Sequence, residues 1–269
     1  MPGAGERPES ILEAKALVAS ASALVRELIE EGISEFPRLP AVEASAVIGD
    51  STSGAGRSAG SSRIASSSLA IDGAIPVVPW ADGARPTLDE VQTHLGDCTR
   101  CDLCQGRRSI VFGDGNPDAD LMFICEGPGE QEDLRGLPFV GRAGELLTQM
   151  IEKGIGIPRS EVYICNIVKC RPPRNRNPRP PEVSACRPFL DGQIRAVAPK
   201  VIVTLGKPAA SLLLDREVAI TRLRGTWQEY QNIPLMPTLH PAYVLRQYTP
   251  ENRRAVWQDL QAAIERTRA

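Results

Sequence analysis

The sequence predicts an α/β fold around a mainly parallel sheet, preceded by a largely disordered N-terminal arm. From Pro86 onward, short β-branched runs alternate with helical segments, which is typical of parallel strands joined by crossover helices. Residues 49–68 consist mostly of Ser, Gly and Ala and have too few apolar side chains to offset the entropy cost of ordering. We therefore expect an extension, 1–85, and one domain, 86–269, in this chain of 269 residues.

The extension differs from the domain in charge as well as in complexity. Residues 1–85 carry 7 Lys or Arg against 11 Asp or Glu, a charge of −4, and residues 86–269 carry 24 against 22, or +2. Apolar residues at near-helical spacing predict one marginal helix at about 9–31, with a partner-binding helix as the alternative. No apolar run approaches the roughly 18 residues of a membrane span, and the chain starts without a signal-peptide pattern. We expect a cytoplasmic protein.

Strands and helices alternate through the domain. Short apolar runs rich in β-branched residues predict strands at 120–125, 162–168, 200–205 and 233–239. Helical patterns between and after them predict helices at 143–153, 181–198, 208–214 and 250–266. Strands connected in this way run parallel, so their carboxyl ends lie at one edge of the sheet.

Polar residues stand where three of the strands end. Glu126 opens a Glu-Gly-Pro-Gly-Glu turn, Asn166 stands three residues before the Lys-Cys-Arg-Pro segment 169–172, and His240 stands before a proline. Ligands of open α/β sheets bind at the carboxyl ends of strands, so these residues should converge on a site. The glycine spacing in the turn matches neither the dinucleotide nor the phosphate-loop motif. A lone histidine is often structural, and Phe139, on a nearby glycine-bounded loop, is either a core residue or a stacking platform.

Seven cysteines in a chain of this size argue against a disulfide scaffold, which belongs to small secreted domains. Cys125 and Cys165 lie in apolar runs and are expected to be core residues. Those outside the strands are Cys98, Cys101, Cys104, Cys170 and Cys186. An iron-sulfur cluster takes four thiolates and tolerates wide separations, whereas structural zinc prefers two close pairs. The spacing leaves a cluster, zinc and no metal as alternatives, with any two of the first three cysteines as ligands.

A proline-rich basic segment accompanies the last two of these cysteines. Its basic residues are Lys169, Arg171, Arg174, Arg176, Arg179 and Arg187. Six positive charges, minus the one negative charge of Glu182, give a local net charge of +5. A solvated loop is the alternative, but the charge favours contact with a polyanionic partner.

Four segments of the domain carry a more specific pattern. They are Glu126-Gly-Pro-Gly-Glu-Gln-Glu-Asp133, Gly136-Leu-Pro-Phe-Val-Gly141, Asn166-Ile-Val-Lys-Cys-Arg-Pro-Pro173 and His240-Pro-Ala-Tyr-Val-Leu-Arg246. In this order and with these gaps, over about residues 88–265, they resemble the family 4 uracil-DNA glycosylases. The resemblance implies an α/β/α sandwich around a four-stranded, mainly parallel sheet, and excision of uracil from DNA by hydrolysis of the N-glycosidic bond. It also implies a [4Fe-4S] cluster, with its ligands at Cys98, Cys101, Cys170 and Cys186.

Under this resemblance the strand-end residues acquire roles in base excision repair. A flipped uracil would be read by the Asn166 side-chain amide, which offers one donor and one acceptor, and would stack on Phe139. His240 would donate to uracil O2 as negative charge develops there, helped by backbone N–H groups of the Glu126–Gly127 turn. Capture of the sugar by water then leaves an abasic site.

The sequence does not identify the group that activates this water. The best-known family of uracil-DNA glycosylases has an aspartate at the position of Gly127. Glu126 and Glu132 are candidates either for orienting the water or for excluding the methyl group of thymine.

The same resemblance implies that the polyanionic partner of the basic segment is DNA. Phosphate contacts are expected from Lys169, Arg171, Arg174, Arg176 and Arg179. Leu245 and Arg246 are placed to wedge into the minor groove and fill the vacated stack. We expect a monomer acting on single- or double-stranded DNA, with a repair or replication partner for the extension. The rivals are a non-catalytic iron-sulfur protein that binds nucleic-acid lesions, and a redox or zinc protein.

Overall fold

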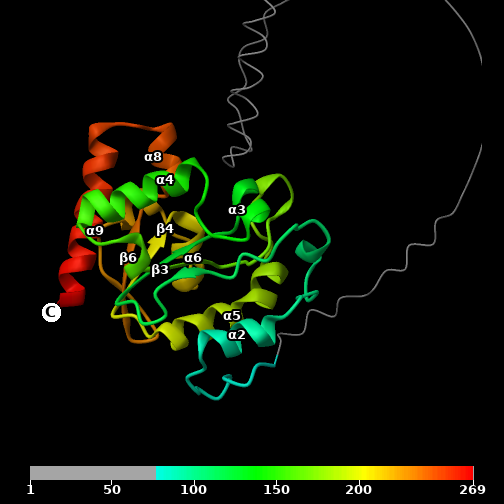
Figure 1. Ribbon diagram of the computed structural model, residues 1–269. Helices are drawn as coiled ribbons and strands as arrows, with labels where there is room; N and C mark the ends of the chain where they lie inside the picture. Colours follow the sequence, from blue (N-terminus) through cyan, green and yellow to red (C-terminus); the bar gives the residue numbers. More distant parts are fainter. Residues whose placement is uncertain (1–76, 269) are drawn as a thin grey trace, which may run out of the picture.

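A computed structural model describes residues 77–268, so the helix predicted at 9–31 lies outside the described residues. A single sheet lies at its centre (Figure 1). The sheet has six strands in the order β1-β3-β2-β4-β6-β5. The four inner strands run parallel and are β3 (Tyr163–Asn166), β2 (Leu121–Cys125), β4 (Val201–Leu205) and β6 (Ile233–Thr238). The predicted α/β class and its four parallel strands are confirmed.

The sheet has two edge strands that the sequence pattern did not indicate. β1 (Asp114–Gly115) pairs antiparallel with β3, and β5 (Gln228–Tyr230) pairs antiparallel with β6. These strands are two and three residues long and mostly polar. They contain no apolar run, which is the signal that identified the other four strands.

The central strands are buried on both faces. Every residue of β2 and β4 is buried, as expected for parallel strands covered by helices on both sides. Alternate side chains of β2 enter different cores: Phe123 packs in the core that includes Ile151 and Leu260, whereas Ile124 packs in the core that includes Leu190. This alternation makes the domain a three-layer α/β/α sandwich.

The helices divide between the two faces of the sheet (Figure 1). One face carries α4 (Arg142–Gln149), its π-helical continuation η2 (Met150–Ile155) and α9 (Pro250–Arg268). The other carries α5 (Pro180–Val197) and α6 (Lys207–Leu213), with α2 (Leu88–Leu95) packed on α5. The shorter elements are η1 (Asp102–Gln105), α3 (Glu130–Arg135), η3 (Arg159–Glu161), η4 (Pro173–Asn175), α7 (Ile220–Leu223) and α8 (Pro241–Arg246).

Packing begins before residue 86. Val78 and Trp80 are buried, and the Trp80 indole donates to the Pro188 carbonyl at 2.9 Å. A side chain at Gly192 would collide with the Trp80 ring, so α5 is shaped to receive it. The division into extension and domain stays a prediction, but residues 77–85 belong with the packed part, because two buried anchors in this short segment outweigh its low complexity.

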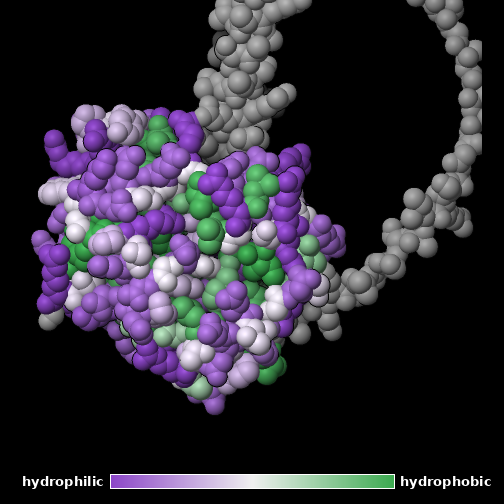
Figure 2. Space-filling view, in the orientation of Figure 1, coloured by the Kyte–Doolittle hydropathy of each residue, from purple (hydrophilic) through white to green (hydrophobic). Residues whose placement is uncertain are grey.

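The visible face of the molecule is mainly hydrophilic, with separate hydrophobic patches (Figure 2). Within residues 77–268, no helix has both the length and the apolar composition needed to cross a membrane.

Candidate active site

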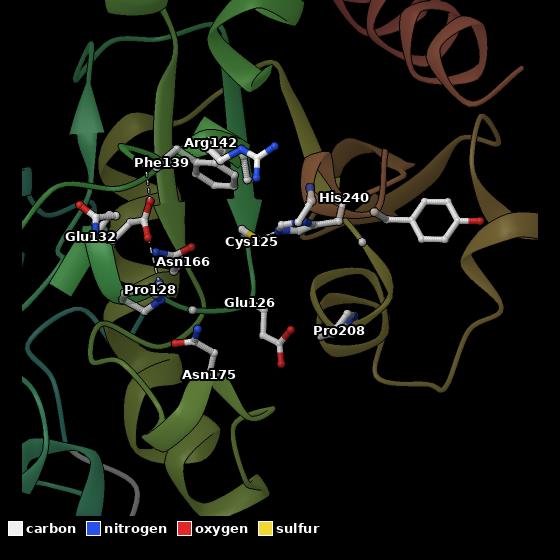
Figure 3. A pocket seen from close by; sticks show the side chains of 18 of the residues that line it. Cys125, Glu126, Pro128, Glu132, Phe139, Arg142, Asn166, Asn175, Pro208 and His240 are labelled. Atoms are coloured by element: carbon white, nitrogen blue, oxygen red, sulfur yellow. Dashed lines mark hydrogen bonds between the residues drawn. The ribbon is translucent and has the colours of Figure 1, made fainter. Parts of the chain in front are cut away.

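A cavity of about 710 Å³ lies at the carboxyl ends of the parallel strands. Glu126 follows β2, Asn166 ends β3 and His240 follows β6, and all three line this cavity together with Phe139 (Figure 3). The volume falls within the range of small-molecule pockets. The strand ends thus bring together the polar residues that the sequence placed there.

Asn166 presents an unpaired amide to the cavity. It is only 2% exposed and stands beside Cys125 in the register of β2 and β3. Its backbone carbonyl accepts from Lys169 Nζ at 2.6 Å, which fixes the main chain beneath it. Among the described residues, no protein group is recorded as a hydrogen-bond partner of its side chain. Both the donor and the acceptor of this amide are therefore available to a ligand.

Phe139 is held in a backbone conformation that bulky residues rarely adopt. Its φ is +54°, in the left-handed region. Gly144 makes this possible, since a Cβ there would lie 2.0 Å from the Phe139 carbonyl oxygen. Arg159 Nη2 also donates to the preceding carbonyl, of Pro138, at 2.8 Å. The Phe139 ring is thereby fixed with its centroid 6.0 Å from that of His240 and the two planes 30° apart.

Glu132 connects two segments of the cavity wall, the loop that carries Phe139 and the Gly-Pro-Gly turn. One carboxylate oxygen accepts from the backbone N–H groups of Val140 and Gly141, at 2.9 and 3.1 Å. The other accepts from Gly129 N–H at 3.1 Å. The Phe139 loop and the Gly-Pro-Gly turn are thus tied to one side chain. This geometry favours a structural role for Glu132 over the activation of water, because three backbone donors already hold its carboxylate.

Glu126 has the opposite surroundings. Burial raises the pKa of its carboxyl to about 7, and its buried Oε1 has no hydrogen-bond partner within the described part of the chain. Buried polar atoms are nearly always paired, so an orphaned carboxylate oxygen in a cavity wall indicates a place for a ligand or water.

His240 is a neutral hydrogen-bond donor. Its Nδ1 accepts the backbone N–H of Ala242 at 3.0 Å, at the start of α8. Burial, and secondarily the charge of Arg246, lowers the pKa of the imidazole to about 4. Because Nδ1 is an acceptor, the single proton of the neutral ring lies on Nε2. That nitrogen is 3.0 Å from Cys125 Sγ at the cavity wall.

A second cavity is bordered by cysteines. Its wall includes all five of the cysteines outside the predicted strands, Cys98, Cys101, Cys104, Cys170 and Cys186. Burial raises the pKa of the Cys170 and Cys186 thiols to about 12 and about 11. Arg107 lies against this group, donating to Cys98 O at 2.6 Å and to Cys170 Sγ at 3.6 Å. Such cationic donors favour thiolates over thiols.

Lys169 cannot contact DNA, contrary to the sequence-based expectation. It is 1% exposed, and its ammonium donates to Asn166 O and to Gln193 Oε1 on α5. The side chain turns under the end of β3 and supports the strand. A buried lysine with such partners is a structural residue, and the predicted phosphate contact is wrong at this position.

The remaining arginines of the basic segment fall into three groups. Arg176 forms a two-pronged ion pair with Glu182, at 2.8 and 2.5 Å, and Arg171 donates to Asn175 Oδ1 at 2.8 Å. These bonds order the loop. Arg174 and Arg179 are exposed and extend from it. Arg187, half-buried, bonds Asp191 and Tyr230 instead.

The two α8 candidates differ in their relation to the main cavity. Leu245 and Arg246 occupy the last turn of α8 and are partly exposed, and of the two, Arg246 lines the cavity. Sequence reasoning missed Cys125, which was expected to be an ordinary core residue. Its position immediately before Glu126, at a strand end, was the available signal.

Comparison with known proteins identifies relatives of the described domain. A family model described as the uracil DNA glycosylase superfamily matches residues 112–261. The type-4 uracil-DNA glycosylase of Thermotoga maritima is 46% identical over 180 residues, which cover 65% of this chain and 92% of the relative. Type-4 uracil-DNA glycosylases of Sulfurisphaera tokodaii and Saccharolobus solfataricus are 42% and 41% identical over 187 and 186 residues, covering 66% of this chain and 84% and 85% of theirs.

Proposed function

The chain belongs to the uracil DNA glycosylase superfamily, and from this we propose that it excises uracil from DNA by hydrolysing the N-glycosidic bond of deoxyuridine. The observation that carries the proposal is the cavity in which an unpaired amide, an aromatic ring and a neutral imidazole donor face the same space. A non-catalytic lesion binder would need the amide and the ring, but not a donor held in one tautomer.

Recognition rests on Asn166 and Phe139. The target nucleotide must leave the base stack to enter a cavity at the strand ends. The Asn166 amide can accept from uracil N3–H and donate to O4, whereas cytosine presents the reverse pattern on the same edge. Because the amide has no recorded protein partner in the described domain, pairing with the base costs no internal bond. The Phe139 ring, fixed by its loop, offers a face for stacking.

His240 stabilises the leaving group. Cleavage leaves negative charge on uracil, and an Nε2–H donor placed at O2 stabilises that charge more in the transition state than in the ground state. A preorganised donor of this kind is worth about 3 kcal/mol. The ring is neutral at pH 7 because burial lowers the pKa of the imidazole to about 4. Its proton is therefore donated as a hydrogen bond, without the ring having been charged.

We propose that Glu126 activates the attacking water. Of the two candidate carboxylates, Glu132 is held by three backbone N–H groups, and Glu126 has a buried oxygen without a recorded partner. A carboxyl whose pKa is raised by burial to about 7 is partly ionised at neutral pH and can accept a proton from water as the water attacks the sugar. The protonated form then loses its proton to solvent.

We further propose that Cys98, Cys101, Cys170 and Cys186 hold a [4Fe-4S] cluster. The cysteine-bordered cavity supports this fit, since thiols from three chain segments meet there beside Arg107. Structural zinc, which prefers two close pairs of ligands, is the alternative at the same cysteines. When bound, the cluster supplies a cross-link between the segment before β2, the end of β3 and α5. Cys104 borders the same cavity and is the spare thiol.

The DNA-facing residues are proposed from exposure. Arg174 and Arg179 project from the ordered loop to contact phosphates, and the Arg171 and Arg176 pairs hold that loop. Leu245, at the end of α8, is positioned to enter the stack that the flipped base vacates. The expected monomer, the cytoplasmic location and a repair or replication partner for residues 1–85 stay predictions.

The test is a uracil-release assay on the purified chain. A labelled single strand and a duplex, each with one deoxyuridine, are incubated with the protein and then treated with alkali. We expect strand breaks at the uracil position and none in matched strands carrying cytosine or thymine. Tight binding of uracil-containing DNA without abasic sites would favour the lesion-binding alternative and refute the proposal.

A further inference from the structure

Cys125 contacts the group to which the chemistry is assigned. It is the last residue of β2 and is buried, and its Sγ lies 3.0 Å from Nε2 of His240, which is 115 residues away in the sequence (Figure 3). On its other side the thiol lies 3.8 Å from the carbonyl oxygen of Leu205, the last residue of β4. The thiol therefore bridges the ends of two strands and the imidazole.

The direction of the bonds follows from the partners. Nδ1 of His240 accepts from Ala242 N–H, so the imidazole proton is on Nε2 and points to the sulfur. The thiol proton is then free to point to the Leu205 carbonyl, which can only accept. Burial raises the pKa of the Cys125 thiol far above its ordinary range, in keeping with a neutral group that accepts one bond and donates another.

We propose that Cys125 is a positioning residue for His240: its sulfur holds the Nε2–H donor at the cavity wall and releases it when uracil O2 takes its place. This inference rests on the proposed function, which assigns the donor role to His240. Thiol sulfur is a weak acceptor. It satisfies a buried N–H in the free enzyme, yet it competes poorly with an oxygen that is gaining negative charge.

Replacing the Cys125 thiol by a hydroxyl or by a methyl group should impair the enzyme in different ways. A hydroxyl at this position would be a stronger acceptor than sulfur. The neutral carbonyl of bound uracil would compete with it poorly, so the cost of detaching Nε2–H would fall on the transition state and lower kcat. A methyl group would leave the buried N–H without a partner and the ring without its lateral contact.

The chain provides a matched control. Cys165 is also a fully buried thiol in the sheet, on the neighbouring strand β3, and pairs in register with Ile124. It packs in the other hydrophobic core, away from His240. Changes at Cys165 therefore report the effect of removing a core thiol, without the contact to the imidazole.

The experiment compares Cys125→Ser, Cys125→Ala and Cys165→Ser with the full-length protein, by kinetics and by nitrogen NMR of labelled histidine. The sequence has two histidines, so His94→Gln assigns the His240 signals. We expect the His240 Nε2–H signal to shift toward stronger hydrogen bonding in Cys125→Ser and toward weaker in Cys125→Ala, with Nδ1 nearly unchanged. We expect kcat on uracil-containing single strands to fall about three- to tenfold in Cys125→Ser, with KM within about twofold. Cys165→Ser should match the wild type in both measurements.

Two results would overturn the inference. An Nε2–H signal that stays in place in both Cys125 variants would show that the contact does not exist, and a shifted signal with unchanged kcat would show that it does not matter for the reaction. Cys125→Ser is nearly isosteric, so it keeps the test valid if Cys125→Ala does not fold. If the wild type released no uracil, the proposed function would fail, while the NMR signal would still show whether the contact exists.

Discussion

Replacing Glu132 separates a structural role from a catalytic one. Its carboxylate accepts three backbone N–H groups, two on the Phe139 loop and one on the Gly-Pro-Gly turn. Hydrogen bonds to a charged group contribute about 1.5–3 kcal/mol each, and solvent reduces this at a partly exposed side chain. We expect Glu132→Ala to lower the free energy of unfolding by about 3 kcal/mol, since all three donors lose their acceptor.

Glu132→Gln keeps the carbonyl oxygen that can serve the two donors of the loop and loses only the bond to Gly129. The expected loss of unfolding free energy is about 1 kcal/mol, a third of that in Glu132→Ala. If the loop carries Phe139 into place, kcat/KM should fall about 100-fold in Glu132→Ala and less than about fivefold in Glu132→Gln.

Urea unfolding and single-turnover uracil release provide the two measurements, with Glu161→Ala, an exposed charge removal on η3, as the control. A Glu132→Gln protein that is as stable as expected, yet as inactive as Glu132→Ala, would refute the reasoning. That result would mean that the carboxylate itself takes part in the reaction.

Three further predictions concern other groups. The pKa of the Glu126 carboxyl is raised from its ordinary 4.5 to about 7. The rate of uracil release should therefore rise with pH through about 7, and Glu126→Gln should lose this dependence. Because the folded protein holds this proton more tightly than the unfolded chain does, the free energy of unfolding should fall as pH rises from about 4.5 to 7. Arg174→Ala should reduce the salt slope of DNA binding by about one, whereas Lys169→Met should lower stability and leave the slope unchanged, as binding titrations at several salt concentrations would reveal. Cys170→Ala should lose the iron, about four atoms per chain, and Cys104→Ala should retain it.

The inner sheet was predictable because its signal is local. Each inner strand lies in a short, mainly apolar run, and the polar residues at the strand ends mark the edge of the site. Asn166 and His240 could be placed together on that basis alone. β1 and β5 could not be found, since two or three polar residues carry no periodicity and pair only because a neighbouring strand is there.

The parts of the site that sequence reasoning missed depend on the direction in which a side chain points and on partners that are far away in the sequence. Nothing in the sequence shows that the Lys169 side chain turns beneath the sheet to Gln193, so its charge was counted with the exposed arginines. Glu132 accepts hydrogen bonds from backbone N–H groups, and because almost every residue has such a group, the residue types do not reveal these bonds. The contact of Cys125 with His240 joins two residues that only the completed sheet brings together.

The central claim is that the strand-end cavity breaks the glycosidic bond with His240 as the donor. Its most direct test is single-turnover release of uracil by the wild type, by His240→Ala and by His94→Ala, which changes the only other histidine of the sequence. The account predicts that His240→Ala slows release by at least about 100-fold, with little change in affinity for uracil-containing DNA, and that His94→Ala releases uracil at the wild-type rate. Release by His240→Ala at the wild-type rate would contradict it.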